Sequence, residues 1–486
     1  MESNPLAIWL IAFYLICLPV IGWLAKSKNT RLKDYYLAGG SVGFVGLFFT
    51  LYASTYSGNT MLGFAGRAYR EGPVSLFTVI GMASVIPVFM LFARRLNRLA
   101  KEHNFVTIAD FLKLRYRNLG LVYLINTLLI LTLASYVLTN LKAAGLLVEV
   151  ISDGKISMVH AIFGLAIVMA VYESLGGMRA VIWTDMLQGI MLLVGSIVVF
   201  SIVAVEVTAK AEFIEQLKVG SRTWVPLDDN QIRRGISLIM MFGVAIAIYP
   251  HALQRIFAAK NWETLRSSFK WMCLMPLLTT LPIMLSGLLA VFVLGQSQPL
   301  QGGDTDRVIP ILLQYLSTEV PMLKWVVALF MAAALAAIMS TVDSALLSLG
   351  SMFTQDIIRP VYTSLDDKRL AFIGRVMTWL LMLVTAVLAA FVSKTIWSLI
   401  VLKLEIMLQL APSIILGVLI SRLNWLNVFC GIVVGVSVTI ALKFIPSGES
   451  YMFGIHAGIW GLGANLMVIF LTQVLVPHKN KDVLLH

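Results

Sequence analysis

Two stretches far apart in the chain carry groups that can replace water around a hard cation. The first, MAAALAAIMSTVDSAL (331–346), places Ser340 and Thr341 side by side in a long apolar run. Ala337, Ser340 and Thr341 follow an i, i+3, i+4 spacing, so on a helix they share one face and present one carbonyl and two hydroxyls. Hard cations prefer oxygen ligands. This pattern favours half of a cation site, although small residues on apolar helices also serve close packing alone.

The second stretch, LYASTYSGNTMLGFAG (51–66), has complementary features. Polar residues and glycines at 57–60, 63 and 66 interrupt an apolar helix. An interrupted helix frees the carbonyls of its last intact turn, and Ala53 and Tyr56 are three residues apart there, on one face. Together with Ala337, Ser340 and Thr341 they supply three carbonyls and two hydroxyls. A sodium ion needs about five or six such oxygens and no carboxylate. The five groups can therefore form a sodium site if the two stretches meet in the fold.

The elements that must position these groups are membrane helices. The chain has 486 residues, of which 59% are hydrophobic and only 13% charged, and its mean hydropathy is +0.88. A soluble protein is about 25% charged. Apolar runs of ~20 residues, each long enough to cross a bilayer, recur along the whole chain. We therefore predict an all-α integral membrane protein with about 13 spans: 5–25, 41–66, 73–93, 119–145, 156–172, 180–207, 234–256, 271–295, 323–353, 371–393, 396–421, 425–442 and 455–476.

The net charge of +12 is explained by membrane orientation and not by a nucleic-acid partner. If the N-terminus is outside, the inward segments carry 23 of the 37 lysines and arginines. This bias predicts a multi-pass protein of the cytoplasmic (inner) membrane with its C-terminus in the cytoplasm. The first span has no basic leader or cleavage site and is interpreted as retained. Membrane lipid is then a partner, nucleic acid is not, and a monomer suffices for transport.

Two predicted spans are interrupted at mid-depth. Besides 41–66, the span 234–256 contains Gly243 and the sequence Tyr249-Pro250-His251. Proline removes a backbone donor and disrupts the preceding turn. Unwound backbone at membrane depth is tolerated where it lines a cavity. Because the breaks fall in the second and seventh spans, they suggest inverted repeats of five spans with a solute site at their interface. The alternative is that glycine and proline are simply common in membrane helices.

Ionisable residues within membrane spans are costly and usually functional. Asp185 is a further candidate for the cation pathway, or else a helix-terminal acid held by backbone donors. His251 is suited to bind solute or respond to pH, or is a satisfied structural histidine. Lys403 and Glu405 are two residues apart, so they do not face each other on a helix. One is expected to line the solute cavity and the other to meet a neighbouring helix.

The candidate solute contacts gather at the two breaks and the charged span: Ser57, Asn59, Thr60, Tyr249, His251 and Glu405. Amides and hydroxyls suit carboxylate or hydroxyl groups, with a slight preference for an amino acid or a small carboxylate. The chain has no Walker loop, no metal-ligand spacing and no nucleophile–base pair, so nothing indicates an enzyme.

Four segments in order resemble the sodium:solute symporter family: ASTYSGN (53–59), YESLGGMRAVIWTDMLQG (172–189), YPHALQRIFAAKN (249–261) and AAIMSTVDSALLSLGSMFTQDI (336–357). The family includes sodium-coupled carriers for proline, pantothenate, sialic acid and sugars. The resemblance, which extends to the loop VTIADFLKLRYRN (106–118), implies a five-plus-five inverted repeat after one extra N-terminal helix.

The resemblance also bears on the cation site. The family's main sodium site would map onto the same carbonyls of Ala53, Tyr56 and Ala337 and hydroxyls of Ser340 and Thr341. Asp185 falls on the family's Thr-Asp position near the ion path. Some members hold a second sodium with this acid and three hydroxyls, but Ala337 stands at one of those positions and has none. We therefore prefer one co-transported sodium per solute.

The sequence as a whole predicts a single transmembrane domain (1–486). Its expected parts are an extra helix (5–25), a first repeat (41–207), a second repeat (234–421) and two C-terminal helices (425–476). The predicted function is sodium-coupled import of a small organic solute by alternating access. The alternatives are a proton-coupled carrier, which would use Asp185 or His251, and a sugar or vitamin substrate with the same sodium mechanism.

Overall fold

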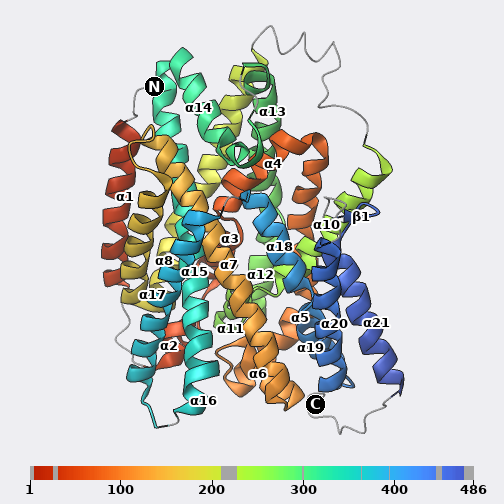
Figure 1. Ribbon diagram of the computed structural model, residues 1–486. Helices are drawn as coiled ribbons and strands as arrows, with labels where there is room; N and C mark the ends of the chain where they lie inside the picture. The colour runs from red at the N-terminus through yellow and green to blue at the C-terminus, as the bar shows by residue number, and fades with distance from the viewer. Residues whose placement is uncertain are drawn as a thin grey trace.

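The computed structural model describes residues 5–25, 31–209, 227–297, 300–362, 364–392, 394–444 and 451–475. Within this part, nine helices are long and apolar enough to cross a membrane, or ten if the bent pair α10 and α11 counts as one span. Three more apolar helices, Trp9–Leu24, Phe44–Thr55 and Met158–Ser174, are shorter. The prediction of an all-helical membrane protein is confirmed (Figure 1).

The helices of the first half follow the predicted runs closely. They are α1 (Pro5–Leu24), α2 (Leu32–Leu37), α3 (Phe44–Thr55), α4 (Phe64–Glu71), α5 (Phe77–His103), α6 (Ile108–Tyr116), α7 (Leu119–Ile151) and α8 (Met158–Thr208). Inside α8, Gly177 has a φ of 60° and a ψ of −154°, so this long element is two helices joined at a kink. A left-handed φ of this kind is open to glycine and strained for other residues.

The second half contains α10 (Asp229–Ala247), α11 (Pro250–Ala258), α12 (Trp262–Met272), α13 (Leu281–Ser297), α14 (Val308–Glu319), α15 (Lys324–Met352), α16 (Arg359–Val361), α17 (Asp367–Phe391), α18 (Ile396–Leu408), α19 (Gly417–Leu419), α20 (Trp425–Lys443) and α21 (Ala457–Leu475). Two short strands, β1 (Tyr451–Met452) and β2 (Ile455–His456), pair antiparallel before α21. The segment between the predicted spans 271–295 and 323–353 carries α14, whereas residues 210–226, between the predicted spans 180–207 and 234–256, lie outside the described residues.

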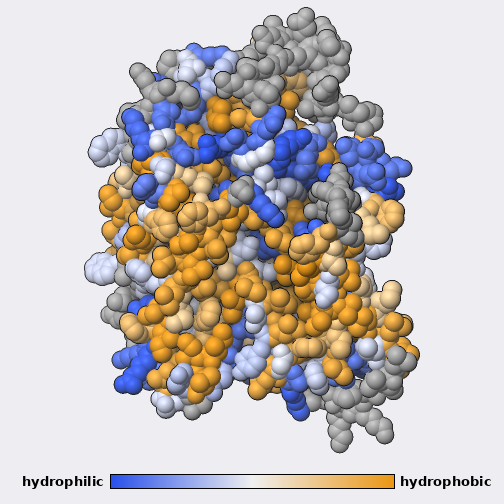
Figure 2. All heavy atoms as spheres, in the orientation of Figure 1, coloured by the Kyte–Doolittle hydropathy of each residue, from blue (hydrophilic) through white to orange (hydrophobic). Residues whose placement is uncertain are grey.

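The surface matches a lipid environment. Large apolar side chains such as Phe13, Trp183 and Leu383 are exposed, and Figure 2 shows apolar residues over a broad band of one face, with polar residues near both ends. With the N-terminus outside, the predicted spans place the basic segments 26–40, 94–118, 354–375 and Arg422 inside. Helices α2, α6, α16 and α19, which lie in or next to these segments, are found at one end, and α4, α13 and α14 lie towards the other (Figure 1). The basic loops thus share one side of the molecule.

Helix α15 forms the centre of the fold. From Phe330 to Met352 every side chain is buried, and the helix packs against α1, α3, α7, α8 and α17. Its small residues allow this close approach: a Cβ added at Gly195 of α8 would lie only 2.6 Å from the Cβ of Ala333. Close helix contact through small residues is the usual mode of packing in membranes. The packing role and the cation-site role of this alanine-rich stretch are therefore compatible.

Both predicted helix breaks are present. Helix α3 ends at Thr55, Tyr56 is extended (φ −101°, ψ 110°), and a π-helical segment, η2 (Asn59–Gly63), leads into α4. Helix α10 ends at Ala247 and α11 begins at Pro250, with a bend of 50° between them. The residues around both breaks are buried, so the freed backbone groups lie inside the protein.

Candidate functional site

The two oxygen-bearing stretches meet in the structure. The Ser340 hydroxyl lies 3.0 Å from the carbonyl oxygens of both Ala53 and Ala337. The Thr341 hydroxyl lies 3.4 Å from the Ala53 oxygen and 3.0 Å from the Ala337 oxygen. All four residues are fully buried. Two carbonyls from different helices and two hydroxyls therefore converge on one small volume at the centre of the bundle.

The Ala53 carbonyl is available because the helix stops there. In a continuous helix it would accept the N–H of Ser57, but that N–H donates to the Thr60 hydroxyl at 3.3 Å. Likewise the Thr60 N–H donates to the Ser57 carbonyl and not to that of Tyr56. Tyr56 itself is buried at the C-cap of α3. The break thus releases the carbonyls of Ala53 and Tyr56 from the helical hydrogen-bond pattern.

A glycine holds the break against α15. A Cβ added at Gly58 would lie 2.2 Å from the Ile338 side chain and 3.3 Å from the Cβ of Ala143 on α7. Ile338 directly follows Ala337, whose carbonyl belongs to the converging set. The absence of a side chain at residue 58 therefore lets the first break approach the part of α15 that carries Ala337, Ser340 and Thr341.

Asp185 lies beside these oxygen groups and is paired with the side chain of Arg255. Its carboxylate accepts a hydrogen bond from the Thr50 hydroxyl at 2.5 Å and lies 3.7 Å from the guanidinium of Arg255. Arg255 also donates to Ser344 at 2.5 Å and to Thr50 at 3.2 Å. Asp185 and Arg255 are both fully buried. The sequence indicated Asp185 but not its partner, because a pairing between α8 and α11 leaves no local pattern.

The second break contributes to an aromatic cluster around Lys403. The Tyr136 ring stacks on His251 at 5.6 Å and lies 5.4 Å from the ring of Tyr249. The ammonium nitrogen of Lys403 lies 3.6 Å from the ring centre of Tyr136 and 4.9 Å from that of Tyr249. Neither ring nitrogen of His251 makes a hydrogen bond of standard geometry with the described residues. A narrow gap, too tight for a water molecule in this structure, lies between Lys403, Tyr136 and Tyr249.

Tyr136 connects the aromatic cluster to the oxygen cluster. Its hydroxyl lies 3.4 Å from the Ser54 carbonyl oxygen and also faces the side chains of Ser57 and Thr341. The Tyr136 ring therefore contacts Lys403, while its hydroxyl faces Thr341 of the converging oxygen groups. The sequence did not single out Tyr136, because a tyrosine in an apolar helix has no distinctive spacing.

The polar residues of the first break are partly engaged with one another. The Ser57 hydroxyl accepts the N–H of Asn59 at 3.2 Å, and Thr60 accepts the N–H of Ser57. The side-chain oxygen of Asn59 is buried without a hydrogen-bond partner among the described residues. Of the three, Asn59 thus has the free acceptor, whereas the hydroxyls of Ser57 and Thr60 hold the local backbone.

The structure does not bring Glu405 to the breaks. Its carboxylate forms an ion pair with Lys443 and lies 3.6 Å from His456, and a Cβ added at Gly458 of α21 would lie 2.8 Å from its Cα. Because residues two apart point to different faces of a helix, Lys403 faces Tyr136 whereas Glu405 faces α20 and α21. The prediction that Glu405 contacts the solute finds no support in this geometry, and Lys403 is the residue that faces the aromatic cluster.

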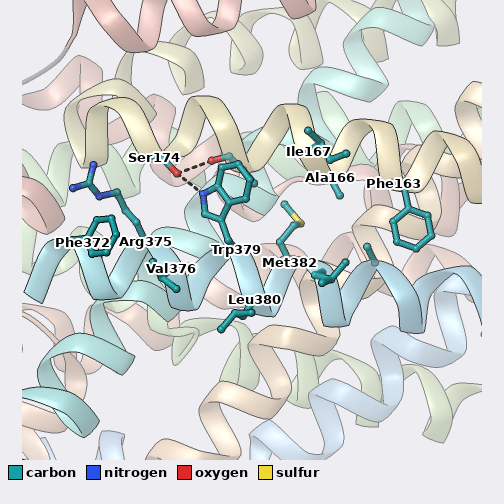
Figure 3. Close-up of a pocket in the computed structure, with 13 residues that line it drawn as sticks. Phe163, Ala166, Ile167, Ser174, Phe372, Arg375, Val376, Trp379, Leu380 and Met382 are labelled. Carbon is teal, nitrogen blue, oxygen red and sulfur yellow. Dashed lines mark hydrogen bonds between the residues drawn. The ribbon is translucent and has the colours of Figure 1, made fainter.

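A wide crevice lies away from both clusters. It has a volume of about 640 Å³ and runs between α8 and α17, where apolar residues such as Phe163, Ile167 and Leu380 line it (Figure 3). The Trp379 indole N–H donates to the Ser174 hydroxyl at 2.8 Å across it. The crevice shares no residue with the converging oxygen groups or with the aromatic cluster, and its exposed apolar walls fit contact with lipid.

Known proteins match this chain over most of its length. The sodium/proline symporter of Escherichia coli (strain K12) is 25% identical over 464 residues, covering 91% of this chain and 88% of the relative. The sodium/pantothenate symporter of Haemophilus influenzae is 27% identical over 393 residues, covering 78% and 76%. A Na⁺-coupled sialic acid symporter, solved in a substrate-bound outward-open state, shares the fold with a TM-score of 0.78 at 18% identity, covering 98% of this chain and 99% of that one.

The family resemblance seen in the motifs is confirmed. Residues 35–435, which include both breaks, the Asp185–Arg255 pair and helix α15, match the Sodium:solute symporter family. This chain therefore belongs to the sodium:solute symporter family and is a multi-pass membrane transporter, not an enzyme.

Proposed function

We propose that this sodium-coupled solute symporter imports a small organic solute, an amino acid or a small carboxylate, together with one sodium ion by alternating access. The observation that carries the proposal is the convergence of Ala53, Ala337, Ser340 and Thr341 across the first break. The Tyr56 carbonyl completes a set of five oxygens. Such a site needs no carboxylate, because dipoles and hydroxyls suffice for a monovalent ion.

The proposed stoichiometry of one sodium follows from the charges nearby. Asp185 is the acid that would serve as a ligand of a second sodium. However, the Arg255 guanidinium lies 3.7 Å from its carboxylate, and both side chains contact Thr50. A fixed guanidinium therefore neutralises the carboxylate. Asp185 remains a candidate for the ion path, where its role would be to hold α8 and α11 around the cation ligands.

The proposed architecture has 13 spans, counting the broken pairs and the shorter apolar helices as spans. They divide into an extra helix (5–25), two inverted repeats (41–207 and 234–421) and two C-terminal helices (425–476). We place the protein in the cytoplasmic membrane with the N-terminus outside, since the basic loops share one end of the molecule. The proposed solute site lies between the two breaks and includes Ser57, Asn59, Thr60, Tyr249 and His251.

Sodium is proposed to act by joining the first break to α15. With the ion bound, Ala53 and Tyr56 are held against Ser340 and Thr341. Tyr136 contacts both this region and the proposed solute site, so its position couples the two. A ligand shifts a conformational equilibrium only by its differential affinity for the two states. One charge crossing ~100 mV supplies ~2.3 kcal/mol and a tenfold sodium gradient ~1.4 kcal/mol. Together they allow about 500-fold accumulation of a neutral solute.

The sodium proposal is tested by removing the two hydroxyls. In Ser340→Ala/Thr341→Ala the site loses two ligands, each worth about 1.5–3 kcal/mol when bonded to a charge. The sodium concentration for half-maximal stabilisation of the purified protein is expected to rise roughly 100-fold or more. The measurement is thermal unfolding in sodium chloride against choline chloride at constant ionic strength.

The matched control is Ser286→Ala/Thr385→Ala, which removes two buried hydroxyls whose hydrogen bonds stay within their own helices. It should keep the sodium dependence of the parent protein. Unchanged sodium dependence in the Ser340/Thr341 variant would show the assignment to be wrong. Solute uptake in sodium-free medium, driven by a pH gradient alone, would instead favour the proton-coupled alternative through Asp185 or His251.

A further inference from the structure

Lys403 is a buried cation without an acid partner among the described residues. This α18 residue is 2% exposed, and among the described residues the contacts of its ammonium are with the aromatic rings of Tyr136 and Tyr249. Aromatic faces attract a cation but do not neutralise it. A charge buried at membrane depth without a counter-charge is costly and is retained where it has a function. Lys403 therefore calls for a negative partner from outside the chain.

The other lysine and arginine side chains that are buried among the described residues have acceptors in the protein itself, and the buried carboxylate of Glu405 has a cation. Arg67 pairs with Glu71, Arg255 with Asp185, and Glu405 with Lys443, while the Lys142 ammonium donates to the carbonyls of Val392 and Lys394. Lys142 is the closest comparison, since it is also a buried lysine on a membrane helix. The two lysines differ in their acceptors: Lys142 donates to two backbone oxygens, whereas no oxygen acceptor for Lys403 is found in the described part of the chain.

The space next to Lys403 defines the chemistry of a ligand. The gap beside Lys403 is closed in this structure, so a ligand must move its walls apart to reach the ammonium; these walls are Thr132, Leu133, Tyr136, Tyr249, Lys403 and Met407. No aspartate or glutamate belongs to this lining, so nothing there would pair with an ammonium group. One ammonium group, two aromatic rings and the apolar side chains beside them suit a carboxylate on a short apolar tail. A zwitterion would bring its own ammonium close to that of Lys403.

We propose that Lys403 binds the carboxylate of the transported solute, and that this solute is a small organic acid without a compensating positive charge. The inference rests on the proposed sodium-coupled function and narrows its substrate class from amino acids and carboxylates to carboxylates. Tyr136 joins the two sites, since its ring contacts Lys403 and its hydroxyl faces the sodium ligand Thr341. With one sodium per anion, the transported pair carries no net charge.

The test uses thermal unfolding of the full-length purified protein with matched probes. L-Lactate and pyruvate are the carboxylates, lactamide and pyruvamide their uncharged counterparts, L-proline the zwitterion and D-glucose the neutral polyol. In sodium chloride the carboxylates should raise the unfolding temperature. The two amides, proline and glucose should not raise it at the same concentrations.

The decisive variant is Lys403→Met, which keeps the length of the side chain and removes its charge. It should need at least tenfold more carboxylate for the same stabilisation, while Lys403→Arg, which keeps the charge, should recover part of the affinity. Without a probe, Lys403→Met should unfold at the parent temperature or above, because an unpaired buried charge has been removed. The control Lys142→Met should lose stability without a probe and keep its carboxylate response.

Two results would overturn the inference. One is stabilisation by proline or glucose that is equal in the parent protein and in Lys403→Met. The other is an unchanged carboxylate response in Lys403→Met together with a loss of probe-free stability like that of Lys142→Met, which would make Lys403 a structural residue. Stabilisation by sodium alone, measured against choline, reports on the sodium site separately and is expected to persist in Lys403→Met.

Discussion

At the scale of single residues, this protein separates neutral oxygen ligands from paired charges. The proposed sodium ligands Ser340 and Thr341 are uncharged, whereas the acid next to them, Asp185, is paired with Arg255. This division has a physical reason. A neutral cage can release its ion, but an unpaired carboxylate in a dry interior would hold a cation too strongly or take up a proton.

Removing one member of the Asp185–Arg255 pair should destabilise the protein more than removing both charges. Arg255→Met leaves a buried carboxylate without its cation and is expected to cost about 3–5 kcal/mol of unfolding free energy. In Asp185→Asn/Arg255→Met neither charge remains, so much of that loss should be regained. Thermal unfolding of the single and double variants in the same detergent measures the difference. A double variant no more stable than Arg255→Met would contradict a direct pairing.

At the scale of elements, function depends on how closely the first break approaches α15. Gly58 has a φ of −54° and a ψ of −28°, so its backbone conformation would accept any residue. What forbids a side chain is space, since an added Cβ would lie 2.2 Å from Ile338. The glycine is therefore required by helix-to-helix distance and not by chain flexibility.

Gly58→Ala is expected to destabilise the protein by about 1–3 kcal/mol, the usual cost of overpacking, and to weaken sodium binding as the break is pushed away from Ala337. Gly164→Ala is the matched control: this exposed glycine of α8 has open space around an added Cβ, so the change should be neutral or stabilising by about 0.5–1 kcal/mol. Unfolding curves with and without sodium measure both effects.

A second substitution tests whether steric crowding is the reason for weaker sodium binding in Gly58→Ala. Ile338→Ala removes the atoms that an added Cβ at residue 58 would meet. Sodium binding in Gly58→Ala/Ile338→Ala should therefore be closer to that of the parent protein than in Gly58→Ala alone. If the second change brings no recovery, steric contact with Ile338 is not the reason for the loss.

At the scale of the whole molecule, the orientation in the membrane follows from charge. Loops rich in lysine and arginine gather at the end that carries α2, α6, α16 and α19 (Figure 1), and such loops remain on the cytoplasmic side. The proposed import direction depends on this orientation, because the sodium gradient drives solute from the outside inward.

Cysteine labelling of intact cells tests the orientation. In a background where Cys17, Cys273 and Cys430 are replaced by serine, Lys155→Cys should react with a membrane-impermeant maleimide added outside. His103→Cys, which is also exposed and is the last residue of α5 before α6, should react only after the membrane is permeabilised. The reverse pattern would place the N-terminus in the cytoplasm.

The sequence alone determined the class of the protein and the chemistry of its candidate site. Membrane helices are visible from composition and run length, because each must bury its backbone within its own hydrogen bonds. The two breaks are visible because glycine, proline and clustered polar residues act locally. The family motifs and the choice of Ala337, Ser340 and Thr341 also depend only on neighbours along the chain.

Which of these groups meet depends on how the helices pack in three dimensions. The Ser340 hydroxyl and the Ala53 carbonyl are 287 residues apart in sequence but 3.0 Å apart in space. Arg255 and Asp185 are likewise distant in sequence and close in space. The structure also shows that Lys403 faces the aromatic cluster while Glu405 faces α21. Helical periodicity shows that two residues lie on different faces, but not what each face touches. That depends on the packing of helices distant in sequence, which leaves no local signal.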